Sequence, residues 1–153
     1  MTNSNLVLSI GSNKDRDENL KQALANLQSI FKIVCVSAKY EFDCIKAPHN
    51  PRYLNQIVII ESKDSLENIN ECLKKIEKSL RKIKTKEECS IDIDLIFTIK
   101  NKKDLIIINK LKSTTDPYIV VPCSELIPDL IHPEKNLSFL ELSNQMKILN
   151  FRL

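Results

Sequence analysis

The stretch that decides the fold runs from residue 90 to residue 97 and reads Ser90-Ile91-Asp92-Ile93-Asp94-Leu95-Ile96-Phe97. Its alternation is typical of a strand, with the apolar residues Ile91, Ile93, Leu95 and Phe97 on one face and Asp92 and Asp94 on the other. At a rise of about 3.3 Å per residue the two carboxylates lie roughly 6–7 Å apart, so their charges repel unless a cation lies between them. The spacing suits one or two Mg²⁺ ions; the alternative is an edge strand whose polar face contacts water.

Length and composition indicate one globular domain, which we take to span residues 1–153. The net charge of +3 does not point to a nucleic-acid binder, and we expect neither a signal peptide nor a membrane span. Five widely spaced cysteines without a C-x-x-C pair indicate reduced thiols in a cytoplasmic protein. The two histidines, His49 and His132, each lie beside a proline and are interpreted as surface residues, so a zinc site is not indicated.

The order of the predicted elements gives the fold class. In chain order they are a strand over 5–10, a helix over about 17–31, a strand-rich run over 32–42, a loop over 43–52, a strand over 53–62, a helix whose apolar stripe runs from Ile69 to Ile83, and the acidic strand. This is the order of a ferredoxin-like, or split βαβ, α+β sandwich. Two helices cover one face of such a sheet, so Asp92 and Asp94 are expected on the face that these helices leave free.

Several local signals refine this outline. Gly11, the one glycine in the chain, follows the first strand and indicates a backbone position that a Cβ atom would obstruct. Asp15 with Glu18, and Asp64 with Glu67, resemble capping boxes at the starts of the two helices. Beyond the acidic strand we expect an extra strand over 105–109 and a short terminal helix over 138–146. The stretch 116–130 between them mixes apolar residues with three prolines, and no element is assigned to it.

Two groups of side chains are candidates for a site beside the carboxylates. Lys82 and Lys84 lie in the connection before the acidic strand, where they could neutralise metal-bound phosphates; a solvated helix end is the alternative. Tyr53 and Tyr118 could hold a planar heterocycle, with the Asn55 amide donating and accepting at its edge. A strand tyrosine by itself is more typical of a core or its rim.

With these residues in order, the chain resembles the 6-hydroxymethyl-7,8-dihydropterin pyrophosphokinase family of the folate pathway, over residues 6–140. The resemblance rests on the Leu-Ser-Ile-Gly-Ser-Asn segment that ends at Asn13, on Tyr53-Leu54-Asn55, on the acidic strand, and on the Tyr118 to Pro133 region. It implies a ferredoxin-like fold and transfer of a pyrophosphoryl group from ATP to the pterin hydroxymethyl group, with release of AMP.

The resemblance also implies roles for individual residues. Asp92 and Asp94 would hold two Mg²⁺ ions that clamp the triphosphate. Tyr53 and Tyr118 would stack on the pterin and Asn55 would bind its edge. The backbone from Phe42 to Ile45 would complete this pocket.

The chain departs from the family pattern around the phosphates. Lys82 and Lys84 fall where the family usually has arginines, which keeps the charge without the bidentate geometry. Cys89 stands at the place of another arginine, and Lys110 and Asp116 at the places of a histidine and a further arginine. Losing one such donor typically costs about 10²–10³ in rate.

Three hypotheses follow. The first is an Mg²⁺-dependent pyrophosphokinase in which Lys82, Lys84 and Lys110 replace the missing donors, with ATP and a pterin as its small-molecule partners. The second is a catalytically weakened pterin- or nucleotide-binding regulatory protein of the same fold, which the Cys89 and Asp116 positions favour. The third, an RNA-binding ferredoxin-like domain, lacks paired exposed aromatics. We expect a cytoplasmic monomer that binds neither nucleic acid nor membrane.

Overall fold

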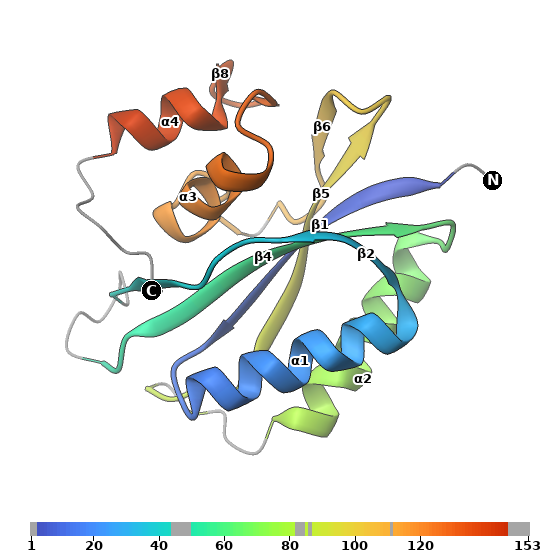
Figure 1. Ribbon diagram of the computed structural model, residues 1–153, viewed down its shortest axis with the longest axis vertical. Coiled ribbons are helices and arrows are strands. Elements are labelled where there is room, and N and C mark those ends of the chain that lie inside the picture. Colours follow the sequence, from blue (N-terminus) through green and yellow to red (C-terminus); the bar gives the residue numbers. More distant parts are fainter. Residues whose placement is uncertain (1–2, 44–49, 82–84, 86, 111, 147–153) are drawn as a thin grey trace.

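The sheet is centred on its first strand, β1 (Ser4–Ser12), in the computed structural model (Figure 1). The structure describes residues 3–43, 50–81, 85, 87–110 and 112–146. The other strands are β2 (Lys32–Val36), β3 (Tyr40–Phe42), β4 (Tyr53–Ser62), β5 (Asp92–Lys100), β6 (Asp104–Ile107) and the two-residue pair β7 (Ile131–His132) and β8 (Leu137–Ser138). The helices are α1 (Arg16–Ile30), α2 (Leu66–Leu80), α3 (Pro117–Leu126) and α4 (Phe139–Gln145).

The main sheet has the order β2-β4-β1-β5-β6. The short strand β3 pairs with the first residues of β4, and β2 pairs with its later residues. Every pairing is antiparallel. Together with α1 and α2 this is the ferredoxin-like arrangement, so the predicted fold class is confirmed. The extra strand and the terminal helix are also found, as β6 and α4. Among the described residues no helix is long and apolar enough to cross a membrane.

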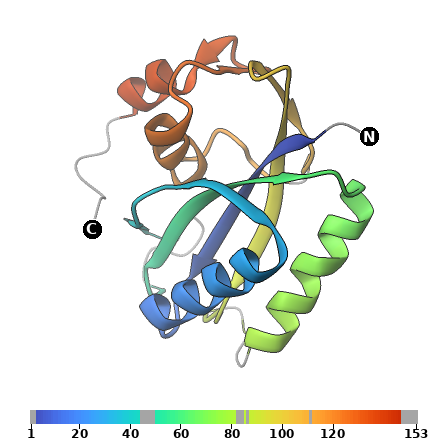
Figure 2. The same ribbon diagram turned by 45° about the vertical axis from the view of Figure 1, so that its right-hand side comes forward.

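Helices cover both faces of the sheet (Figures 1 and 2). Helices α1 and α2 lie on one face and enclose a core that includes Leu6, Leu8 and Ile10 of β1. Helices α3 and α4 lie on the opposite face and share a second core with Val7 and Ile57. The second pair covers only part of its face, which leaves an uncovered part beside α3 for a site.

A β-bulge in β5 corrects one prediction from the acidic stretch. Val7 pairs with Phe97 and Leu8 with Leu95, so Ile96 is an extra residue on β5. The alternation therefore inverts: Leu95 joins the core under α1 and α2, whereas Ile96 and Phe97 join the core under α3 and α4. Phe97 does not share a face with Ile91 and Ile93 as predicted.

Helix α3 lies in the stretch 116–130, to which no element is assigned from the sequence. Pro117 is at its first position, where a missing N–H costs nothing, and Pro128 follows its end. Pro122 lies inside the helix and is buried, as are Ile119 and Cys123, which belong to the second core. Tertiary packing outweighs the loss of one helical hydrogen bond there.

The predicted capping boxes are wrong at both helices. Asp15 has a left-handed backbone (φ 47°) and makes no side-chain cap on α1; the Asn19 amide instead donates to the Lys14 carbonyl at 2.6 Å. The cap of α2 is Ser65, whose hydroxyl accepts from the Asn68 backbone N–H at 3.2 Å. A side chain caps a helix only from the position directly before its first turn, and Asp64 is one residue too early.

Candidate functional site

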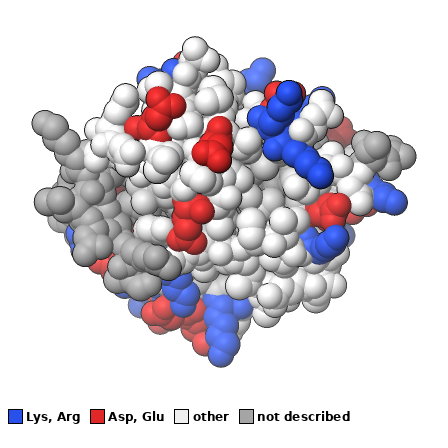
Figure 3. Space-filling view, turned by 45° about the horizontal axis from the view of Figure 1, so that its top comes forward, with Lys and Arg blue, Asp and Glu red and all other residues white. Residues whose placement is uncertain are grey.

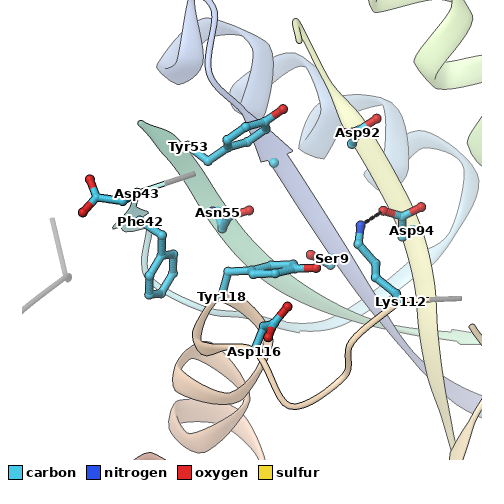
Figure 4. Close-up of a pocket in the computed structure, with 11 residues that line it drawn as sticks. Ser9, Phe42, Asp43, Tyr53, Asn55, Asp92, Asp94, Lys112, Asp116 and Tyr118 are labelled. Carbon is cyan, nitrogen blue, oxygen red and sulfur yellow. Dashed lines mark hydrogen bonds and ion pairs between the residues drawn. The ribbon is translucent and has the colours of Figure 1, made fainter. Parts of the chain in front are cut away.

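A pocket of about 240 Å³ lies on the part of the sheet face that α3 leaves uncovered (Figure 4). Side chains from β1, β3, β4 and β5 line it together with the start of α3 and the segment before it. The lining residues are Ser9, Gly11, Phe42, Asp43, Tyr53, Asn55, Asp92, Asp94, Lys112, Asp116 and Tyr118. The structure thus brings together six residues that the sequence selected: Phe42, Tyr53, Asn55, Asp92, Asp94 and Tyr118.

Gly11 is the floor of this pocket. On the central strand it pairs with Asn55 on one side and with Asp92 on the other. A Cβ atom built on Gly11 would lie 2.6 Å from Asn55 Oδ1, closer than real Cβ contacts come. The expectation of a backbone position that a Cβ would obstruct is confirmed, and the reason is the neighbouring amide.

Each of the two β5 carboxylates is neutralised by a cation of the chain itself. The Arg81 guanidinium donates to Asp92 Oδ1 at 2.6 Å, and the Lys112 ammonium donates to Asp94. The side chains of Asp92 and Asp94 are 31% and 22% exposed, respectively. Two neighbouring carboxylates on one strand face are a donor set that fits a hard divalent ion.

Arg81 is held from behind by α2. Its guanidinium also donates to the Ile91 carbonyl at 3.0 Å and pairs with the buried Glu77 at 3.4 Å. Glu77 Oε1 in turn accepts from the Ile93 backbone N–H at 2.7 Å, so this carboxylate joins α2 directly to the acidic half of β5. These contacts fix the strand on which Asp92 lies.

Tyr118 forms one wall of the pocket and projects into it from the first turn of α3 (Figure 4). Burial, helped by the negative charges of Asp116, Asp94 and Asp92, raises the pKa of Tyr118 far above its usual value. Its hydroxyl therefore stays protonated and uncharged at neutral pH. The Lys112 ammonium lies 5.7 Å from the centre of the Tyr118 ring.

The Tyr118 wall is tied to the Phe42 wall. The Glu125 carboxylate on α3 accepts from the Ala38 backbone N–H at 3.0 Å and from the Tyr40 hydroxyl at 2.5 Å. Since Tyr40 and Phe42 share the short strand β3, these bonds set the distance between the two walls.

Of the three predicted phosphate-binding lysines, Lys110 is the one that the structure describes. Lys82, Lys84 and Ile45 lie outside the described residues. Lys110 is exposed and is not among the lining residues, whereas Lys112, two positions later, is. Asp116 does line the pocket, at the place of an arginine in the family pattern.

Cys89, also at the place of an arginine, is buried and is absent from the described lining residues. Its backbone N–H donates to Asn13 Oδ1 at 2.6 Å, and the Asn13 amide donates to the Glu87 carbonyl at 2.7 Å. Asn13 therefore fixes the connection that enters β5.

Sequence reasoning missed two cations, Arg81 and Lys112. Arg81 is one residue before Lys82, a candidate of the sequence analysis, so its charge was a usable signal. No local pattern marks Lys112, because its position depends on the path of the segment between β6 and α3. The interpretation of His132 as a surface residue is wrong: it is fully buried, with its ring edge-on to Phe97 and Phe139.

Comparison with known proteins adds the family. A sequence profile of the 7,8-dihydro-6-hydroxymethylpterin-pyrophosphokinase (HPPK) family matches residues 7–128. The chain belongs to this family. The HPPK match runs from the middle of β1 past the end of α3 and so includes every described residue that lines the pocket.

Individual relatives are longer than this chain. It is 28% identical to the folic acid synthesis protein fol1 of Schizosaccharomyces pombe over 153 residues, which is 95% of this chain and 21% of that protein. Among solved structures, a Plasmodium falciparum HPPK-DHPS variant with STZ-DHP has a TM-score of 0.71 at 15% identity, over 94% of this chain and 45% of the other. The wild-type HPPK-DHPS with pteroate has a TM-score of 0.68 at 15% identity, over 94% and 42%. This HPPK chain spans about one fifth of the curated relative and less than half of the solved ones.

Proposed function

We propose that this chain transfers a pyrophosphoryl group from ATP to the hydroxymethyl group of 6-hydroxymethyl-7,8-dihydropterin, giving AMP. The observation that carries the proposal is the arrangement around Gly11, which places the Asn55 amide on one side and the Asp92 carboxylate on the other in one pocket. Family membership supports the same reaction.

The pterin half of the pocket suits a flat, polar heterocycle. Tyr118, Phe42 and Tyr53 offer aromatic surface, and Figure 4 shows Asn55 at the back between them. The amide both donates and accepts, which matches the alternating donors and acceptors on the edge of a pterin ring. In this assignment the hydroxymethyl group points away from Asn55 and towards β5.

The charge of the pocket supports a need for Mg²⁺. Four of the described lining residues are carboxylates: Asp43, Asp92, Asp94 and Asp116. A triphosphate would be repelled by them, and bound Mg²⁺, which we assign to Asp92 and Asp94 as two ions, supplies the charge that removes this repulsion and polarises the phosphates. Asp92 and Asp94 would hold and orient these ions, and the aromatic wall would exclude water from the acceptor oxygen.

The reaction itself exchanges one phosphorus–oxygen bond for another. The hydroxymethyl oxygen forms a bond to the β-phosphorus, and the bond from that phosphorus to the oxygen it shares with the α-phosphate breaks. This oxygen leaves with the electron pair as part of AMP, and the hydroxyl proton passes to solvent. Lys82, Lys84 and Lys110 remain the proposed partners of the outer phosphate oxygens.

A second candidate function is ligand binding without efficient turnover. Asp116 favours it, because a carboxylate at this wall repels the phosphates that an arginine would bind. RNA binding is less well supported: on the face in Figure 3, acidic and basic side chains are interspersed among uncharged ones instead of forming a basic stripe.

The deciding experiment measures AMP from ATP, Mg²⁺ and the pterin with purified protein. We expect pterin-dependent AMP that falls at least about 10²-fold in the Asp92→Asn/Asp94→Asn double variant. Asp104→Asn, an exposed aspartate on β6, is the matched control and should keep the wild-type rate. No AMP, despite pterin binding measured by fluorescence in the same sample, would favour the ligand-binding function.

We also infer a cytoplasmic monomer. Cys35, Cys72, Cys89 and Cys123 are free thiols, which supports a reducing compartment. Light scattering of the purified protein would measure the monomer directly, and a dimer mass would contradict this inference.

A further inference from the structure

Lys112 is the one cation among the described residues that line the pocket, and it has no counterpart in the predicted phosphate clamp. Its ammonium donates to Asp94 and lies 5.7 Å from the centre of the Tyr118 ring. In the proposed reaction Asp94 binds the metal and Tyr118 stacks on the pterin. Lys112 therefore lies between the metal and the acceptor, where the β-phosphorus must meet the hydroxymethyl oxygen (Figure 4).

The two cations that neutralise β5 differ in how firmly they are held. Arg81 also contacts the Ile91 carbonyl and the buried Glu77, so it is fixed behind the strand. Lys112 comes from the segment between β6 and α3. Among the described residues, Asp94 is its hydrogen-bond and ion-pair partner and the Tyr118 ring its cation–π partner. A lysine ammonium on a flexible four-carbon stem can change partner within the pocket without any movement of the backbone.

A metal ion on Asp94 must displace the Lys112 ammonium, because both are cations that need the same carboxylate. The displaced ammonium then needs a new anionic partner. The incoming triphosphate offers one beside the carboxylates of the pocket wall. The geometry points to Lys112 as a catalytic residue that exchanges Asp94 for an oxygen of the β-phosphate when metal and ATP bind. This inference rests on the proposed function.

Once it contacts the β-phosphate, Lys112 stabilises negative charge on the pyrophosphoryl group that is being transferred. The hydroxymethyl oxygen bonds to the β-phosphorus, the bond to the bridging oxygen breaks and AMP leaves with that electron pair. The Lys112 side chain donates a hydrogen bond to a non-bridging oxygen, while the hydroxyl proton goes to solvent. Lys112 thus supplies a hydrogen-bond donor to the phosphates, a role that an arginine has in the family pattern.

The test uses two readouts on Lys112→Met, which keeps the length of the side chain and removes its charge. The first is Mn²⁺ affinity of the protein without nucleotide, from electron paramagnetic resonance. Freed from competition, Asp94 should bind Mn²⁺ about three- to tenfold more tightly than in the wild type. The second is AMP formed in a single turnover at saturating Mg²⁺, ATP and pterin, which should fall about 10²-fold.

Two further variants make the result specific. Lys103→Met, at the exposed turn between β5 and β6, should match the wild type in both readouts. Lys112→Arg keeps the charge and should hold Mn²⁺ affinity at the wild-type value and AMP formation within about tenfold of it. Circular dichroism melting shows whether each variant is folded, and Lys112→Arg tests the inference if Lys112→Met is not.

Opposite changes in the two readouts support the exchange, because a merely structural lysine would not strengthen metal binding. Unchanged or weaker Mn²⁺ binding in Lys112→Met would overturn the competition at Asp94. Wild-type AMP formation in that variant would overturn the catalytic role of Lys112 alone. If the wild-type protein forms no AMP, the proposed function fails and the catalytic role with it, while the Mn²⁺ titration still decides the competition.

Discussion

Gly11 determines how close the two halves of the pocket come, and its substitution is the sharpest test at the scale of one residue. In Gly11→Ala the added methyl group would lie 2.6 Å from Asn55 Oδ1, so the buried amide must move. We expect a loss of about 1–3 kcal/mol in unfolding free energy, measured in urea, and at least a tenfold loss of pterin affinity, measured by fluorescence.

A double-mutant cycle identifies the cause. If the clash with Asn55 is responsible, Gly11→Ala should cost much less stability in an Asn55→Ala background than in the wild type. Equal costs in the two backgrounds would show that the methyl group meets something else.

Single residues could be predicted where the signal is local in the sequence, and could not where it depends on tertiary contacts. Gly11, Asp92 and Asn55 stand out because composition and strand alternation mark them locally, and the structure places them side by side. Lys112 and Arg81 could not be paired with their carboxylates from sequence. Each pair crosses a loop whose path is decided by tertiary packing, and a lysine or arginine in a charged stretch is usually only solvated.

At the scale of elements, hydrophobic periodicity predicted which segments are strands and which are helices. It failed to assign the buried face where one extra residue interrupts the alternation. The acidic strand was found, but its bulge changes the face of Phe97. The run Leu95-Ile96-Phe97, three apolar residues in succession, was the available sign of an extra residue. Helix α3 was not assigned, because its stretch mixes apolar residues with three prolines. Pro117 at the first helical position is nevertheless favourable, and Pro122 is compensated by burial.

The cap of α2 gives a prediction at this scale. The Ser65 hydroxyl accepts from the Asn68 N–H, whereas Asp64 makes no such cap. Ser65→Ala should therefore lower the unfolding free energy by about 1 kcal/mol, and Asp64→Ala should change it by less than about 0.5 kcal/mol, both measured by urea denaturation. A larger loss of unfolding free energy in Asp64→Ala than in Ser65→Ala would contradict this assignment and support the capping box that the sequence indicated.

The whole molecule is a sheet with a core on each face, and the pocket depends on both. The core under α1 and α2 follows from the order of strands and helices, which is why the fold class was predictable. The core under α3 and α4 forms through long-range contacts after the bulge, so the sequence did not predict it. Glu125 and His132 join this second layer to the rest: Glu125 holds α3 to the β2–β3 connection, and His132 holds Thr114, which lies between Lys112 and Asp116.

His132 gives a pH dependence for the stability of the whole chain. Its Nδ1 accepts from the Glu134 N–H at 3.1 Å, so the proton is on Nε2, which donates to Thr114 Oγ1 at 2.9 Å. Burial lowers the pKa of His132 below 6.5 and outweighs the nearby Glu134 charge, which raises it. Below about pH 6.5 the unfolded chain therefore binds a proton at His132 that the folded chain does not. The unfolding free energy decreases as the pH is lowered, until the lowered pKa of the folded state is reached.

The matching variant is His132→Gln, whose amide nitrogen can donate to Thr114 but does not titrate. It should be less stable than the wild type at pH 8, because the Glu134 N–H loses its acceptor and the ring contacts with Phe97 and Phe139 are lost. Between pH 6.5 and 5 the wild type should lose unfolding free energy more steeply than the variant, by at most about 1.4 kcal/mol per pH unit, the limit for one proton. Urea unfolding at half-unit steps of pH measures both slopes, and parallel slopes would mean that His132 takes up its proton in the folded chain as easily as in the unfolded one.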